Sequence, residues 1–118
     1  MTSYEQKLLK EPDEVRTFPK GRLELVNIGG GTVGRLILEP GWRWSEHVKP
    51  VAKTELCEAP HFQYHAAGTL HVIMADGSEF DAGPGEITLL PSGHDAYVVG
   101  NEPVVVIDWS GTMDYAKA

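Results

Sequence analysis

From Gly21 onward, the chain is a succession of short runs of strand-forming residues separated by glycine, proline and aspartate. The runs are GRLELVNIG, TVGRLILEP, WRWSEHV, APHFQYHAAG, TLHVIMAD, EFDAG, EITLLP, AYVVG and PVVVIDW. Short strands at regular spacing, bounded by turn signals, are typical of an all-β sandwich or barrel. No stretch after Gly21 has a convincing helical period, so a parallel barrel covered by helices is disfavoured.

Residues 1–20 differ in character from the rest of the chain. They are polar, contain Pro12 and Pro19, and allow a short helical turn around Tyr4 to Leu9. We interpret residues 1–20 as an N-terminal arm that packs on the outside of the barrel or on a second subunit. Residues 21–118 then form one barrel domain, since 118 residues is near the commonest domain size.

The charge of the chain excludes some classes of partner. Ten Lys and Arg residues against seventeen Asp and Glu residues give a net charge of −7, without a basic cluster. Such a chain is a poor candidate for binding nucleic acid or an anionic membrane. The N-terminus has no apolar core long enough for a signal peptide, and no apolar run approaches a membrane span. We therefore expect a cytoplasmic protein.

The stretch PHFQYHAAG carries the strongest functional signal. In a strand, alternate side chains share a face, so His61, Gln63 and His65 lie on one side of this stretch. Three polar side chains on a packed face would each need a partner, whereas they are suited to the lining of a pocket. Further histidines occur upstream at His47 and downstream at His94. Imidazole is a common ligand of transition metals, so we predict a metal site.

Two spacing patterns connect these histidines with glycine and proline. Gly85 is followed by five residues and then by Pro91-Ser92-Gly93, with His94 next. Gly41 is followed by five residues and His47, and six residues separate His61 from Gly68. The chain thereby resembles the cupins, whose motifs read G(x)5HxH(x)3-4E(x)6G and G(x)5PxG(x)2H(x)3N. The resemblance covers residues 22–109 and implies a cupin-type double-stranded β-helix, a jelly-roll-like barrel.

The departures from the cupin motifs alter the implied metal ligands. Lys49 stands where the family has its second histidine, and His61 stands where it has glutamate. The implied ligand set is therefore His47, His61 and His94, similar to the three histidines of the thiol dioxygenase branch. A neutral set leaves the charge of the metal uncompensated, which favours an anionic substrate or hydroxide as the next ligand. The resemblance also implies a homodimer.

Other residues have open alternatives. Gln63 is a pocket liner that could bind substrate or act as a fourth ligand, and Lys49 and Tyr97 are further candidates for substrate binding. Cys57, the only cysteine, is a soft ligand or a small buried hydrophobe. A structural role is expected for His65, an outward orientation for His71, and outward or subunit-contacting positions for the pair Trp42 and Trp44.

Three functional hypotheses follow. The first is an enzyme of dioxygenase, isomerase or lyase type that acts on a small polar or anionic molecule through a divalent metal: iron, zinc, nickel or manganese. The second is a non-catalytic barrel that binds or senses a metabolite, with or without metal. The third is a metal-free structural barrel.

Overall fold

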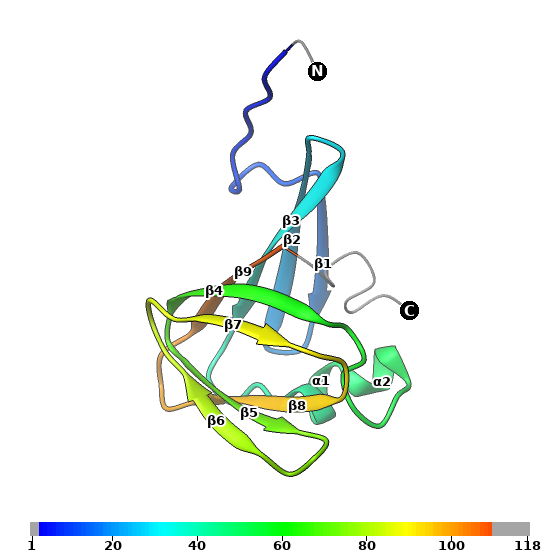
Figure 1. The fold of residues 1–118 in the computed structure, drawn as a ribbon, viewed down its shortest axis with the longest axis vertical. Coiled ribbons are helices and arrows are strands. Elements are labelled where there is room, and N and C mark those ends of the chain that lie inside the picture. The colour runs from blue at the N-terminus through cyan, green and yellow to red at the C-terminus, as the bar shows by residue number, and fades with distance from the viewer. Residues whose placement is uncertain (1–2, 110–118) are drawn as a thin grey trace.

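The computed structural model describes residues 3–109, and within this range the regular structure is mostly β-strand (Figure 1). The strands and two one-turn helices are β1 (Glu14–Phe18), β2 (Gly21–Ile28), β3 (Gly31–Leu38), α1 (Trp44–His47), α2 (Lys49–Ala52), β4 (His61–Ala67), β5 (Thr69–Met74), β6 (Glu79–Ala82), β7 (Ile87–Leu90), β8 (His94–Val99) and β9 (Val104–Asp108). They form two antiparallel sheets, with strand orders β1-β2-β3-β9-β4-β7 and β6-β5-β8. The all-β architecture of two antiparallel sheets expected from the sequence is confirmed.

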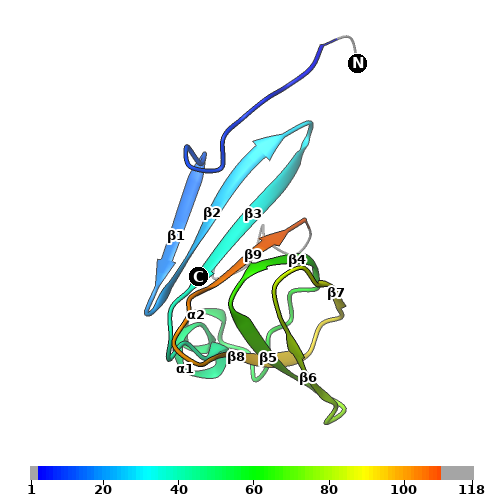
Figure 2. The ribbon, with the colours of Figure 1, turned by 90° about the vertical axis from the view of Figure 1, so that its left-hand side faces the viewer.

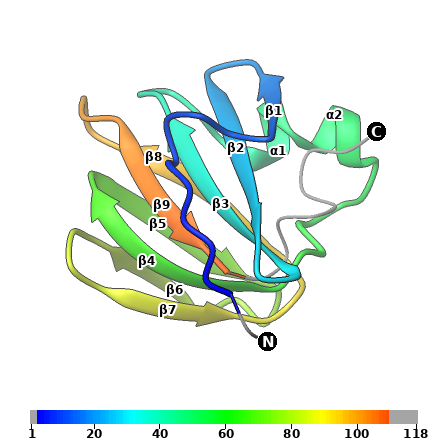
Figure 3. The same cartoon turned by 90° about the horizontal axis from the view of Figure 1, so that it is seen from above.

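The two sheets enclose one hydrophobic core. Alternate residues of the strands face inward, as in β9, where Val104 and Val106 are fully buried between more exposed neighbours. Seen from the side, the three-stranded sheet lies opposite β9, β4 and β7, whereas β1, β2 and β3 extend beyond it (Figure 2). The view from above shows the curvature that brings the two sheets together around the interior (Figure 3). Side chains from both sheets therefore point into the same closed space.

The second half of the N-terminal arm is part of the larger sheet. β1 pairs antiparallel with β2 over its whole length, from Glu14 opposite Leu25 to Phe18 opposite Gly21. The helical turn expected around Tyr4 to Leu9 is not formed, since residues 3–8 have no regular structure and a turn follows at Leu9 and Lys10. The stretch contacts the β2–β3 turn through a hydrogen bond from the backbone N–H of Gly29 to Glu5 Oε2, at 2.7 Å.

The stretch WRWSEHV is not the strand that its alternation predicted. Only Arg43 has an extended conformation, bridged to Tyr97 of β8, and the chain then turns into α1 and α2. Pro50 fits the first turn of α2, where a missing backbone N–H costs no hydrogen bond. This turn carries Trp42 and Trp44 into the core, where each is 2% exposed. The expectation that both tryptophans face outward is therefore wrong.

Gly68, the closing glycine of the first spacing pattern, is required by the fold. Its φ is +73°, and a Cβ built there would lie 2.4 Å from the carbonyl oxygen of Pro103. Only glycine accepts both constraints without a shift of backbone. This residue ends β4 and lets the chain pass into β5, in the opposite sheet.

Candidate metal centre

Three buried side chains with metal-binding atoms meet inside the barrel. His61 begins β4 in the larger sheet, His94 begins β8 in the smaller sheet, and Cys57 lies in the connection before β4. Their ligand atoms all lie within 4.8 Å of one another, and the three residues are only 3–4% exposed. Cys57 is held there by an antiparallel bridge to His94, in which the Cys57 N–H donates to the His94 carbonyl at 2.7 Å.

Asp108 lies behind His61 and fixes its ring. This carboxylate is fully buried, and its Oδ2 accepts a hydrogen bond from His61 Nδ1 and a second one from Gln63 Nε2, the latter at 3.2 Å. Its other oxygen accepts from the backbone N–H of Phe62 at 3.3 Å. The proton on Nδ1 leaves His61 Nε2 as the electron-pair donor, 3.7 Å from Cys57 Sγ. Asp108 thus holds His61 and Gln63 together.

His94 is oriented by a backbone carbonyl in the same way. Its Nδ1 lies 3.1 Å from the carbonyl oxygen of Pro91, which can only accept, so the proton is on Nδ1 and the lone pair on Nε2. Burial is the largest cause that lowers the pKa of His94 to about 4, and the neighbouring His61 lowers it further. The neutral imidazole of His94 is therefore the form present near neutral pH, and it is the form that binds metals.

Cys57 is a thiol rather than a thiolate in the metal-free protein. Burial raises its pKa to about 11, with smaller contributions from neighbouring carboxylates. Its Sγ lies within reach of His61 Nε2, so the thiol proton can be shared with that nitrogen. A coordinating metal removes such a proton outright.

A cavity of about 30 Å³ lies against this cluster. It is lined by the three cluster residues, by Gln63 and by apolar side chains: Leu36, Leu38, Trp42, Trp44, Leu70, Leu90, Ala96 and Val106. This space is enough for one or two water-sized groups. Gln63 and Trp42 both line the cavity, and Gln63 Oε1 and Trp42 Nε1 are buried without a hydrogen-bond partner among the described residues.

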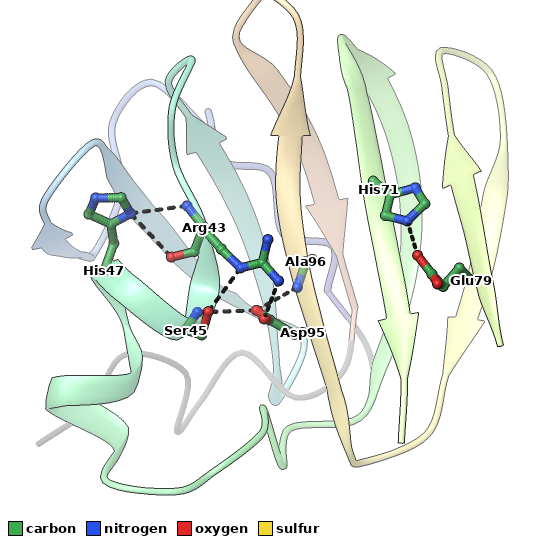
Figure 4. Close-up of polar contacts among 7 residues, drawn as sticks. All are labelled: Arg43, Ser45, His47, His71, Glu79, Asp95 and Ala96. Carbon is green, nitrogen blue, oxygen red and sulfur yellow. Dashed lines mark hydrogen bonds and ion pairs between the residues drawn. The ribbon is translucent and has the colours of Figure 1, made fainter. Parts of the chain in front are cut away.

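The structure does not bring His47 to this cluster. The residue lies in α1, where its Nδ1 accepts a hydrogen bond from the backbone N–H of Arg43 at 3.0 Å (Figure 4). The cause is local, since a helical turn replaces the strand whose spacing had aligned His47 with the other two histidines. Within residues 3–109, the group with metal-ligand spacing contains Cys57 in place of His47.

Two of the three predicted substrate-binding residues lie outside the cavity. Lys49 forms an ion pair with Glu55 at 3.0 Å, at a surface depression beside α2. Tyr97 is on the outer face of β8, where Arg43 lies 5.2 Å from its ring centre. Gln63, the third residue, lines the cavity.

His65 and His71 have the positions expected from the sequence. His65 is buried, with its Nε2 hydrogen-bonded to Thr88 Oγ1 at 2.9 Å, and burial lowers its pKa. His71 is on the outer face of β5, hydrogen-bonded to Asp81 and Glu79 at 2.7 Å each, and Figure 4 shows the Glu79 contact. Neither histidine belongs to the cluster.

Sequence reasoning missed Asp108. A signal was present in PVVVIDW, because Asp108 has the same strand parity as Val104 and Val106 and so shares their buried face. A carboxylate on the inner face of an apolar strand needs a buried partner. That partner is His61.

The fold is similar to several solved structures. No protein-family model matches the sequence, and no curated protein matches it. The polyketide cyclase RemF from Streptomyces resistomycificus is 14% identical, with a TM-score of 0.65 and coverage of 92% of this chain and 79% of that chain. A protein of unknown function from Rhizobium leguminosarum is 20% identical, with a TM-score of 0.59 and coverage of 92% and 97%. A cupin-like protein from Thermotoga maritima is 13% identical, with a TM-score of 0.54 and coverage of 77% and 68%.

Oxalate decarboxylase from B. subtilis provides a further match, at 17% identity and a TM-score of 0.60. The match covers 95% of this chain but only 31% of the decarboxylase chain. With these neighbours, the two antiparallel sheets define the chain as a small protein of the cupin-superfamily fold, with a candidate His/Cys site inside its barrel. Among residues 3–109, no helix has the length and apolar character needed to span a membrane.

Proposed function

We propose that this chain is a metal-dependent enzyme in which Cys57, His61 and His94 hold one divalent transition metal, and a small polar molecule binds at the remaining position. The observation that carries the proposal is the convergence of three ligand atoms within 4.8 Å in a buried cavity. Thiolate and imidazole are suitable donors for zinc, copper, iron and nickel. Three protein ligands with one position left open are characteristic of catalytic centres.

The surrounding residues prepare the site before any ion binds. Asp108 and the Pro91 carbonyl hold protons on the Nδ1 atoms of His61 and His94, so both Nε2 atoms are available as donors. Of the three predicted substrate-binding residues we retain Gln63, which lines the cavity and whose buried Oε1 has no hydrogen-bond partner within residues 3–109. A bound divalent metal would supply Lewis-acid chemistry there.

The reaction class stays within the three types expected from the sequence, which are dioxygenase, isomerase and lyase chemistry. Among the structural neighbours, one is named as a polyketide cyclase and another as an oxalate decarboxylase. Both names are compatible with a carbon-centred lyase or cyclising reaction in a barrel of this fold. They support only the general class of the proposal. A shared fold alone does not transfer a substrate from one protein to another.

Elemental analysis of the purified protein tests the proposal. We expect about one equivalent of a first-row transition metal per chain in the native protein, and loss of that metal in the His61→Ala and His94→Ala variants. His71→Ala is the matched control, because His71 bonds two carboxylates on the outer face of the barrel and should not affect the metal. Full occupancy in His61→Ala, or no binding after reloading the native protein with several metals, would contradict the proposal.

A non-catalytic barrel is the second candidate function. The observation in its favour is the size of the cavity, which at about 30 Å³ admits only water-sized groups unless side chains move. Oxygen consumption or turnover of candidate substrates by the metal-loaded protein separates the two functions. Ligand binding without turnover would favour the sensing barrel.

The predicted homodimer is also part of the proposal. Four large apolar side chains lie exposed side by side on the outer face of β4 and β7, with Phe62 opposite Leu89 and Tyr64 opposite Ile87. Exposed apolar patches of this kind often mark protein interfaces. Light scattering on the native protein and on a Leu89→Lys variant tests it, with a dimer expected for the former and a monomer for the latter.

A further inference from the structure

The candidate metal centre differs in charge from the neutral three-histidine set predicted from the sequence. One of its donors is a sulfur atom, Cys57 Sγ, at 3.7 Å from His61 Nε2. A fully buried carboxylate, Asp108, is hydrogen-bonded to the opposite side of the same imidazole ring. Both groups bring negative charge to a bound cation, and neither was part of the predicted ligand set.

We propose that Cys57 binds the metal as a thiolate and that its charge, together with that of Asp108, neutralises the dication. The site is therefore selective for thiophilic metals, and its open position takes a small neutral molecule that can both donate and accept hydrogen bonds, rather than an anion. This inference rests on the proposed metal-binding function and specifies its metal and ligand class.

The backbone holds Cys57 firmly at the site. Its N–H donates to the His94 carbonyl at 2.7 Å, and its own carbonyl accepts from the Gly93 N–H at 2.8 Å. The side chain is 3% exposed and lines the cavity together with both histidines. Two backbone hydrogen bonds therefore fix Cys57 beside both histidines, as the position of a metal ligand requires.

The cavity wall indicates what kind of molecule fits the open position. Gln63 directs its Nε2 to Asp108, so its buried Oε1 is left as an acceptor without a partner. Trp42 Nε1 is a buried donor without a partner. A neutral molecule with a hydroxyl or amide N–H can donate to an acceptor such as Gln63 Oε1, whereas an anion without a proton, such as azide, cannot.

The charges around the cavity argue in the same direction. Among residues 3–109, none of those that line the cavity is lysine or arginine. A dication with one thiolate ligand and one carboxylate behind an imidazole is formally neutral, so an added anion would leave an uncompensated buried charge. The anionic substrate expected from three neutral histidines is therefore disfavoured.

Donor softness determines which metal is preferred. Thiolate and imidazole ligands favour zinc and copper, whereas manganese prefers carboxylate and water oxygen. Of the metals named from the sequence, zinc fits this donor set best. Copper becomes a candidate that the three-histidine prediction had not included.

Cobalt substitution tests the sulfur ligand. Metal-free protein is titrated with Co²⁺, the bound cobalt is counted by elemental analysis, and the near-ultraviolet spectrum is recorded. We expect one bound cobalt and a sulfur-to-cobalt charge-transfer band that is lost in Cys57→Ser, which exchanges only sulfur for oxygen. X-ray absorption of the zinc-loaded native protein should show one sulfur at about 2.3 Å beside nitrogen at about 2.0 Å, and this holds even if Cys57→Ser fails to fold.

Azide titration of the cobalt protein tests the charge. We expect little spectral change in the native protein, and at least about tenfold tighter azide binding in Asp108→Asn, because one buried negative charge is removed. Equal and tight azide binding in both proteins would overturn the ligand class. Bound cobalt without a sulfur band would overturn the thiolate assignment while leaving the proposed metal site intact, and absence of any bound metal would overturn both.

Discussion

Asp108 at the end of β9 and His61 at the start of β4 form a fully buried pair, in which the Asp108 carboxylate accepts a hydrogen bond from the His61 ring at Nδ1. The two residues are 47 positions apart in the sequence. The pair meets because β4 and β9 are neighbours in the larger sheet, with Asp108 in register with Gln63. The carboxylate determines which nitrogen of His61 faces Cys57.

Replacement of Asp108 by asparagine should weaken metal binding without abolishing it. The loss of a carboxylate that orients a metal-binding histidine costs about 10- to 100-fold in metal affinity. Competition against a chromophoric chelator measures the effect. The matched control is Asp81→Asn, because Asp81 makes the same kind of hydrogen bond to His71 on the outer surface, and its metal affinity should equal that of the native protein.

Trp44→Ala should destabilise the barrel strongly. Trp44 is 2% exposed and part of the core, and removal of such a side chain costs about 3–5 kcal/mol in the free energy of unfolding. Urea denaturation followed by circular dichroism measures the loss. Trp109→Ala, at a residue that is 49% exposed, should cost much less. Equal effects of the two substitutions would contradict the inward position of Trp44.

Gly68→Ala should also destabilise the fold, because an added Cβ meets backbone as well as an unfavourable φ. The Cβ would lie 2.4 Å from the Pro103 carbonyl oxygen, at a φ of +73°. Gly77→Ala isolates the conformational cost, since Gly77 has a φ of +90° but no atom within 4 Å of its Cβ position. We expect about 1–2 kcal/mol for Gly77→Ala and a larger loss for Gly68→Ala by thermal or urea unfolding.

His71 should make stability depend weakly on pH. Hydrogen bonds to Glu79 and Asp81 raise the pKa of His71 above its ordinary value of 6.5. A raised pKa in the folded state means that the stabilisation is fully present below pH 6.5 and is lost as the pH rises through the folded-state value. The difference in unfolding free energy between the native protein and His71→Gln should therefore shrink as the pH rises above 6.5.

The size of this pH effect should be small, because Glu79 and Asp81 are more than half exposed and solvent screens their charges. A variant with both Glu79→Gln and Asp81→Asn should abolish the pH dependence that His71 contributes. A difference that grows with pH would contradict the raised pKa.

The period-two pattern of β4 was enough to predict the inner face of the site. His61 and Gln63 alternate with exposed residues, as the sequence indicated. The spacing around Gly85 placed His94 directly behind a turn, and in the structure this residue begins β8. These features depend on local sequence alone. The stretch from Trp42 to His47 was misjudged because a one-turn helix is too short to show a helical period.

The remaining parts of the site depend on contacts that sequence does not display. Cys57 lies in a connection without regular structure, and only its backbone bridge to His94 brings the sulfur inward. Asp108 acquires its role from the pairing of β4 with β9. Neither pairing has a local signature, so the ligand set predicted from spacing retained His47 instead of Cys57.

The donors of the candidate metal centre come from opposite sides of the barrel, His61 from the larger sheet and His94, with the bridged Cys57, from the smaller one. An ion held by all three residues would link the two sheets across the interior of the barrel. Separation of the sheets beside the site would then require a metal–ligand bond to break, so a bound ion adds stability to a barrel that its hydrophobic core already closes. Slower amide hydrogen exchange in β4 and β8 would therefore report occupancy of the site.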